Sequence, residues 1–424
     1  AAVSESTARP VVVLAAKSPI NPVLSKYLTT GIKKAHEREA QAVVIILNTP
    51  GGLMTAMRDI IEAILNTPIP VIVYVAPQGA QATSAGVFIT MASDVAAMAP
   101  SSNIGAAHPV NLGPSAPVRG AEKEGGKDAS IMEQKAVSDA SAYMESLTKE
   151  KGRNWQWAVS AVTESKSLTA QEAFKQGVID NLADDLKDLF KQLDGKRIHK
   201  DKKEFLLRLT DAPVEEAPMD FMQRFMNYLA HPNIAYILLM LGIYGLIYEF
   251  SSPGVGLGAA IGGISLLLAF MSLQMLPINY TGLLLLLFGI ALFILELKLA
   301  THGVLAIGGI TALVLGSFML IESADAYFRI SSGIILTSAA APFAFFTYAI
   351  GAALDIQRKK PTTGKEGLLG QPALVTRDLD PEGMIMAQGE LWQARSSQGV
   401  IGKGKRVIVE SIDGNHLTVK ELKD

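Results

Sequence analysis

Two short segments near the start of the chain contain the residue types that a serine hydrolase uses. The first, Gly79–Gly86, reads Gly-Ala-Gln-Ala-Thr-Ser-Ala-Gly and places Ser84 among small residues where a helix is expected to begin. A helix N-terminus favours a developing negative charge, and small neighbours let a substrate backbone approach the hydroxyl. The segment is not the complete Gly-x-Ser-x-Gly elbow, because Ala82 replaces the first glycine. Taken alone, Ser84 is better explained as a helix N-cap.

The second segment is the turn Asn48–Gly52, which reads Asn-Thr-Pro-Gly-Gly and follows an apolar run at 42–47. Glycines in such a turn leave backbone N–H groups that no side chain obstructs. N–H groups of this kind can stabilise an oxyanion. Neither segment taken alone is specific for catalysis.

The elements that would position these segments alternate between strands and helices. This alternation predicts an α/β domain with a largely parallel sheet. We expect a polar loop at 110–127, which is rich in Gly, Pro and charge. The expected strands are 11–15, 42–47, 71–75 and 95–97, and the expected helices are 22–38, 54–65, 85–92, 128–150, 154–163 and 170–177.

The middle of the chain is too apolar to form the surface of a soluble domain. Five successive apolar segments each have about the 20 residues that a helix needs to cross a bilayer. They are 233–250, 254–273, 278–298, 303–321 and 331–353. Within them Ala260–Ser265 recurs as Ala306–Thr311, which predicts two similar helical hairpins, packed closely through their glycines.

Basic residues suggest the orientation in the membrane. Arg358–Lys360 follow the last apolar segment, which favours a cytoplasmic location for that end. An odd number of spans would then place the N-terminal domain outside the cytoplasm. The first residues, Ala-Ala-Val-Ser, are consistent with the removal of a secretory signal.

Residues 366–424 return to an ordinary soluble composition, with glycines between five short alternating runs. This pattern predicts a small closed barrel of the OB type. Trp392 is the only tryptophan in the segment, so there is no aromatic row for stacking bases, and we expect a protein-interaction role and no nucleic-acid binding. We divide the chain into domains at 1–195 and 366–424, an amphipathic linker at 196–231 and a membrane domain at 232–355.

Composition excludes several classes of site. The chain has no cysteine, which rules out disulfides, zinc–thiolate sites and a cysteine nucleophile. Its six histidines show no metal-ligand spacing, and its net charge of −2 gives no general attraction to nucleic acid. No metal or cofactor is therefore expected.

The two segments of the first domain, together with Met98–Ala106 and Ser167–Ala173, resemble the Clp/crotonase-type serine peptidase fold. With several membrane spans and a C-terminal barrel behind that domain, the whole chain resembles the long form of the NfeD family. These are membrane-bound serine proteases whose genes lie beside those of stomatin-like proteins. The resemblance implies a hydrophobic segment of a membrane-associated protein as substrate, a stomatin-like partner and a homo-oligomer.

The resemblance also implies the site residues. The nucleophile of the family is the serine of the Ser-Ala-Gly segment, which corresponds to Ser84. Its base is a lysine early on a long helix that ends near Gly-Arg-Asn, and with Gly152–Asn154 in that place the base corresponds to Lys135. A lysine serves as a base only if burial lowers its pKa toward neutrality. The oxyanion donors would be the backbone N–H groups of Gly52 and Ala85.

Alternatives remain for both the base and the function. Lys123 and Lys127 in the polar loop are rival lysines, and His108 lies 24 positions after Ser84, close to the Ser-to-His spacing of Clp peptidases. A Ser–His site would need an orienting carboxylate, and no candidate stands out. The alternative function is a non-catalytic membrane scaffold that binds and organises a stomatin-like protein.

Overall fold

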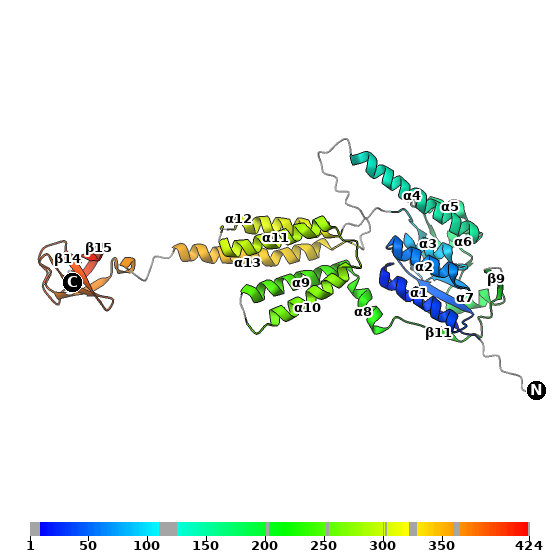
Figure 1. Cartoon of the computed structure of the whole chain (residues 1–424), viewed down its shortest axis with the longest axis horizontal. Coiled ribbons are helices and arrows are strands. Elements are labelled where there is room, and N and C mark those ends of the chain that lie inside the picture. The colour runs from blue at the N-terminus through cyan, green and yellow to red at the C-terminus, as the bar shows by residue number, and fades with distance from the viewer. Residues whose placement is uncertain are drawn as a thin grey trace, which may run out of the picture. The chain divides into compact units, whose positions relative to one another are not determined.

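A computed structural model describes residues 9–109, 125–200, 203–251, 254–299, 301, 303–321, 329–358 and 365–422. They divide into two compact units, 1–341 and 342–424, which are described separately. The first unit contains an α/β domain followed by apolar helices, and the second contains a small barrel (Figure 1).

The described residues of the α/β domain form a six-stranded sheet in which all neighbouring strands are parallel. Its central strands are almost entirely apolar and buried, as expected for strands covered on both faces. The predicted strands are confirmed. They are β1 (Val11–Ala16), β2 (Ala42–Leu47), β3 (Val71–Val75) and β5 (Val95–Met98), in that order in the sheet. Two edge strands that were not predicted complete the sheet, β11 (Val214–Glu216) beside β1 and β8 (Asn181–Leu182) beside β5.

Helices cover both faces of this sheet (Figure 1). Alternate residues of β1 point to opposite faces of the sheet and enter two different cores. Leu14 belongs to one hydrophobic cluster and Val13 to the other. The second cluster includes α7 (Leu186–Leu193). The first includes α1 (Pro22–Glu37), α2 (Met54–Asn66), α3 (Ala85–Ala92), α4 (Gly125–Glu150), α5 (Trp155–Thr163) and α6 (Ala170–Lys175).

A second, three-stranded sheet lies beside the start of α3. It contains β4 (Gln81–Thr83), β6 (Asn103–Gly105) and β7 (Ser167–Thr169). Because β4 ends one residue before Ser84, this sheet fixes the approach to the predicted nucleophile.

The stretch 196–231 contains more secondary structure than a linker requires. Its β9 (Arg197–Lys200) and β10 (Lys203–Leu206) form an antiparallel pair. Next, β11 pairs with β1 at the edge of the main sheet. The stretch ends in a short helix, α8 (Phe221–Leu229), which precedes the apolar helices.

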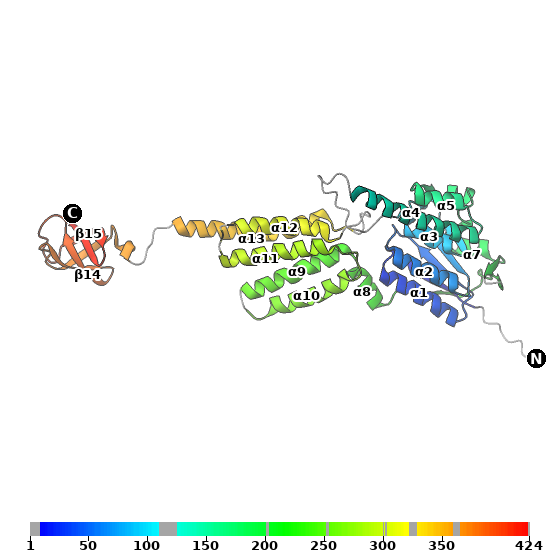
Figure 2. The ribbon, with the colours of Figure 1, turned by 45° about the horizontal axis from the view of Figure 1, so that its top comes forward.

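The apolar helices form the two hairpins that the repeat predicted (Figure 2). A Cβ on Gly262 would lie 3.0 Å from the Gly242 carbonyl oxygen, and one on Gly309 would lie 3.0 Å from the Gly289 carbonyl oxygen. Glycine thus permits the same close approach in both pairs. The pairs are α9 (Pro232–Ser251) with α10 (Leu257–Leu273) and α11 (Tyr280–Leu299) with α12 (Val304–Leu320), and α13 (Ser332–Arg358) follows.

The two hairpins also share a capping device. The Glu249 carboxylate accepts hydrogen bonds from the backbone N–H groups of Gly256 and Gly258, both at 3.1 Å. The Glu296 carboxylate accepts from Gly303 at 2.8 Å and from Leu305 at 3.1 Å. Each glutamate therefore satisfies the free N–H groups at the start of the next helix. These acids have a structural role in the hairpins.

By length and composition alone, α9 is long and apolar enough to cross a bilayer. Four other described helices carry shorter apolar stretches of 10–17 residues, in α10, α11, α12 and α13. These helices make up the helical membrane region that the sequence predicted.

The second unit contains a closed five-stranded barrel, as predicted, preceded by a single 3-10 turn at Lys365–Leu368. Val375, Ile385 and Val409 are among the alternate residues that fill its interior. The strands are β12 (Pro372–Arg377), β13 (Glu382–Ala387), β14 (Glu390–Ser396), β15 (Arg406–Asp413) and β16 (His416–Glu421).

Candidate active site

The structure brings the two sequence segments together through backbone hydrogen bonds. The Thr49 N–H donates to the Gln81 carbonyl oxygen at 2.8 Å, and the Thr83 N–H donates to the Thr49 carbonyl oxygen at 3.1 Å. Thr49 is fully buried, and its hydroxyl accepts from the Gly51 N–H at 3.2 Å. The glycine turn is therefore held rigidly against the strand that leads to Ser84.

Ser84 adopts a strained backbone conformation at the start of α3. Its φ is +55° and its ψ is −115°, a region that residues with a Cβ rarely occupy. Strain of this kind costs on the order of 1–3 kcal/mol and persists only where the surroundings impose it. Ser84 occupies the N-cap position of α3, as the sequence suggested, but its side chain makes no capping hydrogen bond, so the hydroxyl is not used to start the helix.

The glycine turn packs directly on Ser84. A Cβ added to Gly51 would lie 2.6 Å from the Ser84 Cβ and 3.1 Å from its Oγ. At Gly52, where φ is +157°, an added Cβ would lie 2.1 Å from the Ile20 carbonyl oxygen. Both positions thus exclude any larger residue, which explains the paired glycines of the sequence.

Two backbone amides beside the serine remain available. Among the residues that the structure describes, the N–H groups of Gly52 and Ala85 donate to no hydrogen bond. Ala85 is the first residue of α3, where backbone N–H groups have no partner within the helix. Such amides can bind an anion or an oxyanion.

Lys135 lies in the N-terminal half of α4, and its side chain is exposed. In the described part of the chain it makes no hydrogen bond or ion pair with Ser84. The first turns of α4 extend beyond α3 and α5 in both views (Figures 1 and 2). The structure therefore does not assemble a Ser84–Lys135 pair.

The second half of α4 is anchored to the domain. Ala140, Met144 and Leu147 are buried in the core. Asp139, one turn after Lys135, accepts a hydrogen bond at 2.6 Å from the Arg58 guanidinium of α2. Asp139 thus links α4 to α2 one turn after Lys135.

Aromatic contacts continue this anchor toward α3. The Tyr143 ring stacks on Phe88 with ring centroids 6.2 Å apart, and the Arg58 guanidinium lies 4.7 Å from its centroid. Burial raises the pKa of the Tyr143 hydroxyl, and the positive charge of Arg58 partly opposes that shift. Tyr143 is thus a neutral packing residue at neutral pH.

The rival bases have different environments. His108 is partly buried, and its Nδ1 lies 2.8 Å from the Val162 carbonyl oxygen of α5. Because a carbonyl only accepts, Nδ1 carries the proton in that contact. Lys123 lies outside the described residues, and so does the side chain of Lys127.

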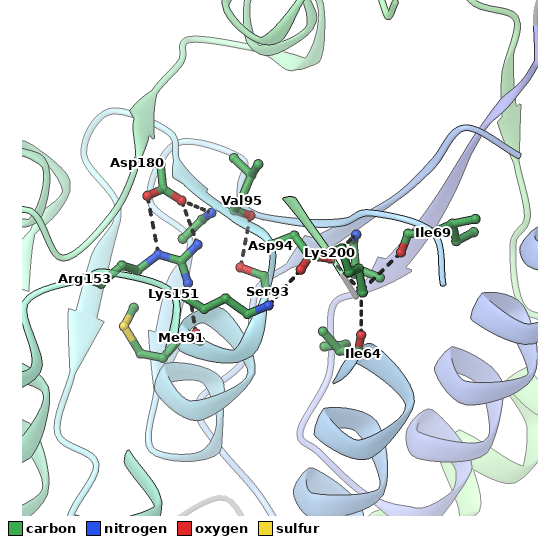
Figure 3. Close-up of polar contacts among 12 residues, drawn as sticks. Ile64, Ile69, Met91, Ser93, Asp94, Val95, Lys151, Arg153, Asp180 and Lys200 are labelled. Atoms are coloured by element: carbon green, nitrogen blue, oxygen red, sulfur yellow. Dashed lines mark hydrogen bonds and ion pairs between the residues drawn. The ribbon is translucent and has the colours of Figure 1, made fainter. Parts of the chain in front are cut away.

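A buried charge cluster that the sequence did not reveal holds the far ends of α3 and α4 (Figure 3). Asp94, just after α3, accepts from Lys151 Nζ at 2.8 Å and from Lys200 Nζ at 2.6 Å. Arg153 donates to Asp180 at 2.6 Å and to the Met91 carbonyl oxygen at 2.9 Å. A cation at the carbonyl end of α3 is electrostatically favourable. Apart from Lys151 and Arg153, these five residues are far apart in sequence, so no local pattern could have linked them.

The described residues contain no group of three or more His, Asp or Glu side chains that could hold a metal ion. Around Ser84 the structure offers a hydroxyl and the backbone N–H groups of Gly52 and Ala85.

Comparison with known proteins gives three family matches along the chain. Residues 10–198 match the N-terminal domain of NfeD1b, residues 233–352 match the NfeD integral membrane domain, and residues 365–421 match the NfeD-like C-terminal, partner-binding domain. The membrane-domain match makes this chain an integral membrane protein.

Several relatives are similar over long stretches. The membrane-bound protease PH1510 of Pyrococcus horikoshii is 36% identical over 402 residues, which cover 92% of this chain and 88% of that protein. A lysine-to-alanine variant of 1510-N, a membrane-bound stomatin-specific protease solved with a substrate peptide, is 33% identical over 52% of this chain and 98% of its own, with a TM-score of 0.46. A serine-to-alanine variant of 1510-N is 33% identical over 50% and 99%, with a TM-score of 0.44.

The order of the three matched regions and the extent of the similarity to the protease PH1510 show that this chain belongs to the NfeD family of integral membrane proteins.

Proposed function

We propose that this protein is a membrane-anchored serine endopeptidase with Ser84 as nucleophile and Lys135 as general base. The observation that carries the proposal is the geometry of Ser84: its backbone is strained, its side chain makes no capping hydrogen bond, and the glycine turn packs against it. Strained residues of this kind cluster at active sites, where rigid surroundings hold them. The protease PH1510, a full-length relative, supports the same class of reaction.

In the proposed reaction, Ser84 Oγ attacks a peptide carbonyl carbon while the neutral Lys135 amine takes the hydroxyl proton. The backbone N–H groups of Gly52 and Ala85 stabilise the oxyanion that forms. The C–N bond then breaks, and the leaving amine receives the proton from Lys135. Water, activated by the same amine, releases the acyl group from Ser84.

Exposed apolar side chains support a hydrophobic substrate. Met132 is 69% exposed and Ile131 is 45% exposed, and both precede Lys135 by about one helical turn. Met54, two residues after Gly52, is also exposed. An apolar peptide that covered these side chains would also remove water from Lys135, and desolvation favours a neutral amine. Binding of a hydrophobic segment would therefore also activate the proposed base.

We also propose a homo-oligomer, in which α4 contacts a second copy or the bound substrate. We further propose that the α/β domain is extracytoplasmic and the barrel cytoplasmic. Arg358–Lys360, after the last apolar helix, support that orientation.

The proposed partner of the barrel is a stomatin-like membrane protein. The C-terminal match is to a partner-binding domain. Three exposed apolar residues, Leu374, Met386 and Leu391, form a cross-strand row on β12, β13 and β14. A row of this kind on a small barrel is suited to protein contact.

The test is cleavage of an internally quenched apolar peptide by the purified full-length protein. We expect Ser84→Ala and Lys135→Ala each to abolish cleavage, while the surface control Lys33→Ala on α1 cleaves normally. Equal cleavage by Ser84→Ala would contradict the enzyme assignment and favour a membrane scaffold. Loss with Ser84→Ala but not with Lys135→Ala would keep the enzyme and remove the dyad, and His108→Ala would then test the rival base.

A further inference from the structure

The short helix α8 exposes an aromatic face immediately before the first membrane helix. Phe221 is 75% exposed and Tyr228 is 71% exposed, and both Met222 and Phe225 are exposed. Phe221, Phe225 and Tyr228 recur at intervals of four and three residues, so they lie on one side of the helix. The Phe221 and Phe225 rings stack with their centroids 6.5 Å apart. Soluble surfaces rarely display such a cluster without a binding role.

Hydrogen bonds fix the other side of α8 to two parts of the first unit. Asn227 Oδ1 accepts from Asn21 Nδ2 at 2.8 Å, and Asn21 is the buried N-cap of α1 in the α/β domain. The Leu229 carbonyl oxygen accepts from the Ser272 hydroxyl of α10. The helix is therefore held between the α/β domain and the membrane helices, and its aromatic face has a defined direction.

The start of the membrane helix sets the environment of that face. α8 ends at Leu229 and α9 begins at Pro232, within the region that leads into the integral membrane domain. The aromatic face thus lies close to the end of α9 that emerges from the hydrocarbon core of the bilayer. Aromatic side chains are enriched in this interfacial zone, because their rings are apolar and the Tyr hydroxyl is polar.

We propose that α8 is an interfacial helix whose Phe221, Phe225 and Tyr228 face inserts into the headgroup region of the lipid bilayer. Amphipathic helices with aromatic residues on one face bind membranes in this way. Arg224 is exposed one helical turn before Tyr228, where its guanidinium can reach lipid phosphates while its stem lies along the apolar rings.

This contact would orient the α/β domain against the membrane. Because Asn227 holds Asn21 at the start of α1, insertion of α8 fixes that end of the domain near the lipid surface. Substrate segments that emerge from the bilayer would then meet the domain in one orientation. The inference concerns lipid binding and does not depend on whether Ser84 is a nucleophile.

The experiment uses the absence of cysteine from the chain, which allows single-site labelling. Phe225→Cys and Tyr228→Cys are prepared in the full-length protein, labelled with an environment-sensitive fluorophore and reconstituted into phosphatidylcholine nanodiscs. Separate discs contain lipid nitroxides placed either near the headgroup or deep in the acyl chain. Matched controls are Lys33→Cys on α1, which should stay in water, and Leu241→Cys on the exposed side of α9, which should lie in hydrocarbon.

We expect the labels at 225 and 228 to be quenched severalfold more by shallow nitroxides than the label at 33, and the label at 241 to be quenched best by deep nitroxides. Labels at 225 and 228 that respond only to aqueous iodide, as the label at 33 does, would overturn the proposal. Labels shielded from both lipid and aqueous quenchers would also overturn it, because a second copy or a partner protein would then cover the face.

Discussion

The two halves of the candidate active site differ in how firmly the fold holds them. Ser84 is fixed by β4, by the glycine turn and by the first turn of α3, and its backbone is strained. Lys135 is exposed on α4, one turn before Asp139, which pairs with Arg58 of α2. The fold thus holds the proposed nucleophile and the proposed oxyanion donors in place, whereas the proposed base is exposed and has no surface covering it among the described residues.

This difference suggests how the proposed protease avoids indiscriminate cleavage. A serine without a paired base is a weak nucleophile, even when its geometry is correct. An enzyme that completes its site only on binding gains specificity, because the correct substrate supplies the energy of assembly. Substitutions can therefore separate effects on Ser84 and the glycine turn, the rigid half, from effects on the exposed Lys135.

The largest expected effect is on catalysis alone. Lys135→Ala should lower kcat/KM for an apolar peptide on the order of 10⁴-fold, as loss of a catalytic base does in comparable sites. Thermal unfolding should be unchanged, because Lys135 is exposed and holds no described partner. Lys135→Arg is the matched control that keeps the charge and removes the base, and it should be equally inactive. Normal activity in either variant would rule out Lys135.

The second-largest expected effect is on the free energy of unfolding, through the glycine turn beside Ser84. Gly52→Ala should lower the free energy of unfolding by about 4 kcal/mol, because strain at positive φ adds to overpacking. The overpacking arises because the new Cβ would meet the Ile20 carbonyl oxygen at 2.1 Å.

Gly79→Ala is its control in the same region. Gly79 also has positive φ, but an added Cβ meets nothing within 4 Å. Its cost should be about 1 kcal/mol, the ordinary penalty of replacing such a glycine. Denaturant unfolding of the two variants measures the difference, and equal costs would show that close packing on Ile20 is unimportant.

A substitution in the buried charge cluster should have an intermediate effect on stability, because the cluster holds the ends of both α3 and α4. Arg153→Met leaves Asp180 and the α3 carbonyl oxygens without their cation, which should cost about 3 kcal/mol of stability. Arg153→Lys should cost less, since a single amine can satisfy one of these groups but not both. The measurement is the unfolding temperature in detergent. A fully stable Arg153→Met would show that the cluster does not hold α3 and α4 together.

The smallest expected effect on stability concerns the ion pair between Arg58 of α2 and Asp139 of α4. Arg58→Asp removes an exposed ion pair with Asp139, so stability should change by less than about 1 kcal/mol. Cleavage should nevertheless slow about 10-fold, because a displaced helix misplaces the base. The double variant Arg58→Asp, Asp139→Arg should recover most of the rate. No recovery would mean that the pair does not orient α4.

Much of the architecture was predictable because its signals are local. Buried strands such as 42–47 and 71–75 are continuous apolar runs, and the structure places them where expected. The membrane hairpins followed from a repeated glycine pattern, and the barrel from short alternating runs between glycines. The capping role of Glu249 and Glu296 was not predicted, although their equivalent positions in the repeat were visible.

The sequence by itself determined the residue types of the candidate site, since Ser84 and the glycine turn stand in recognisable local patterns. Only the tertiary structure decided what those residues do in the folded chain. It placed Ser84 at the N-cap of α3 without a capping hydrogen bond from its hydroxyl, and it left Lys135 exposed. It also joined Asp94 to Lys200 across 106 positions. The physical reason is that backbone strain, exposure and buried ion pairs arise from segments that meet in space, and neighbours in sequence do not specify them.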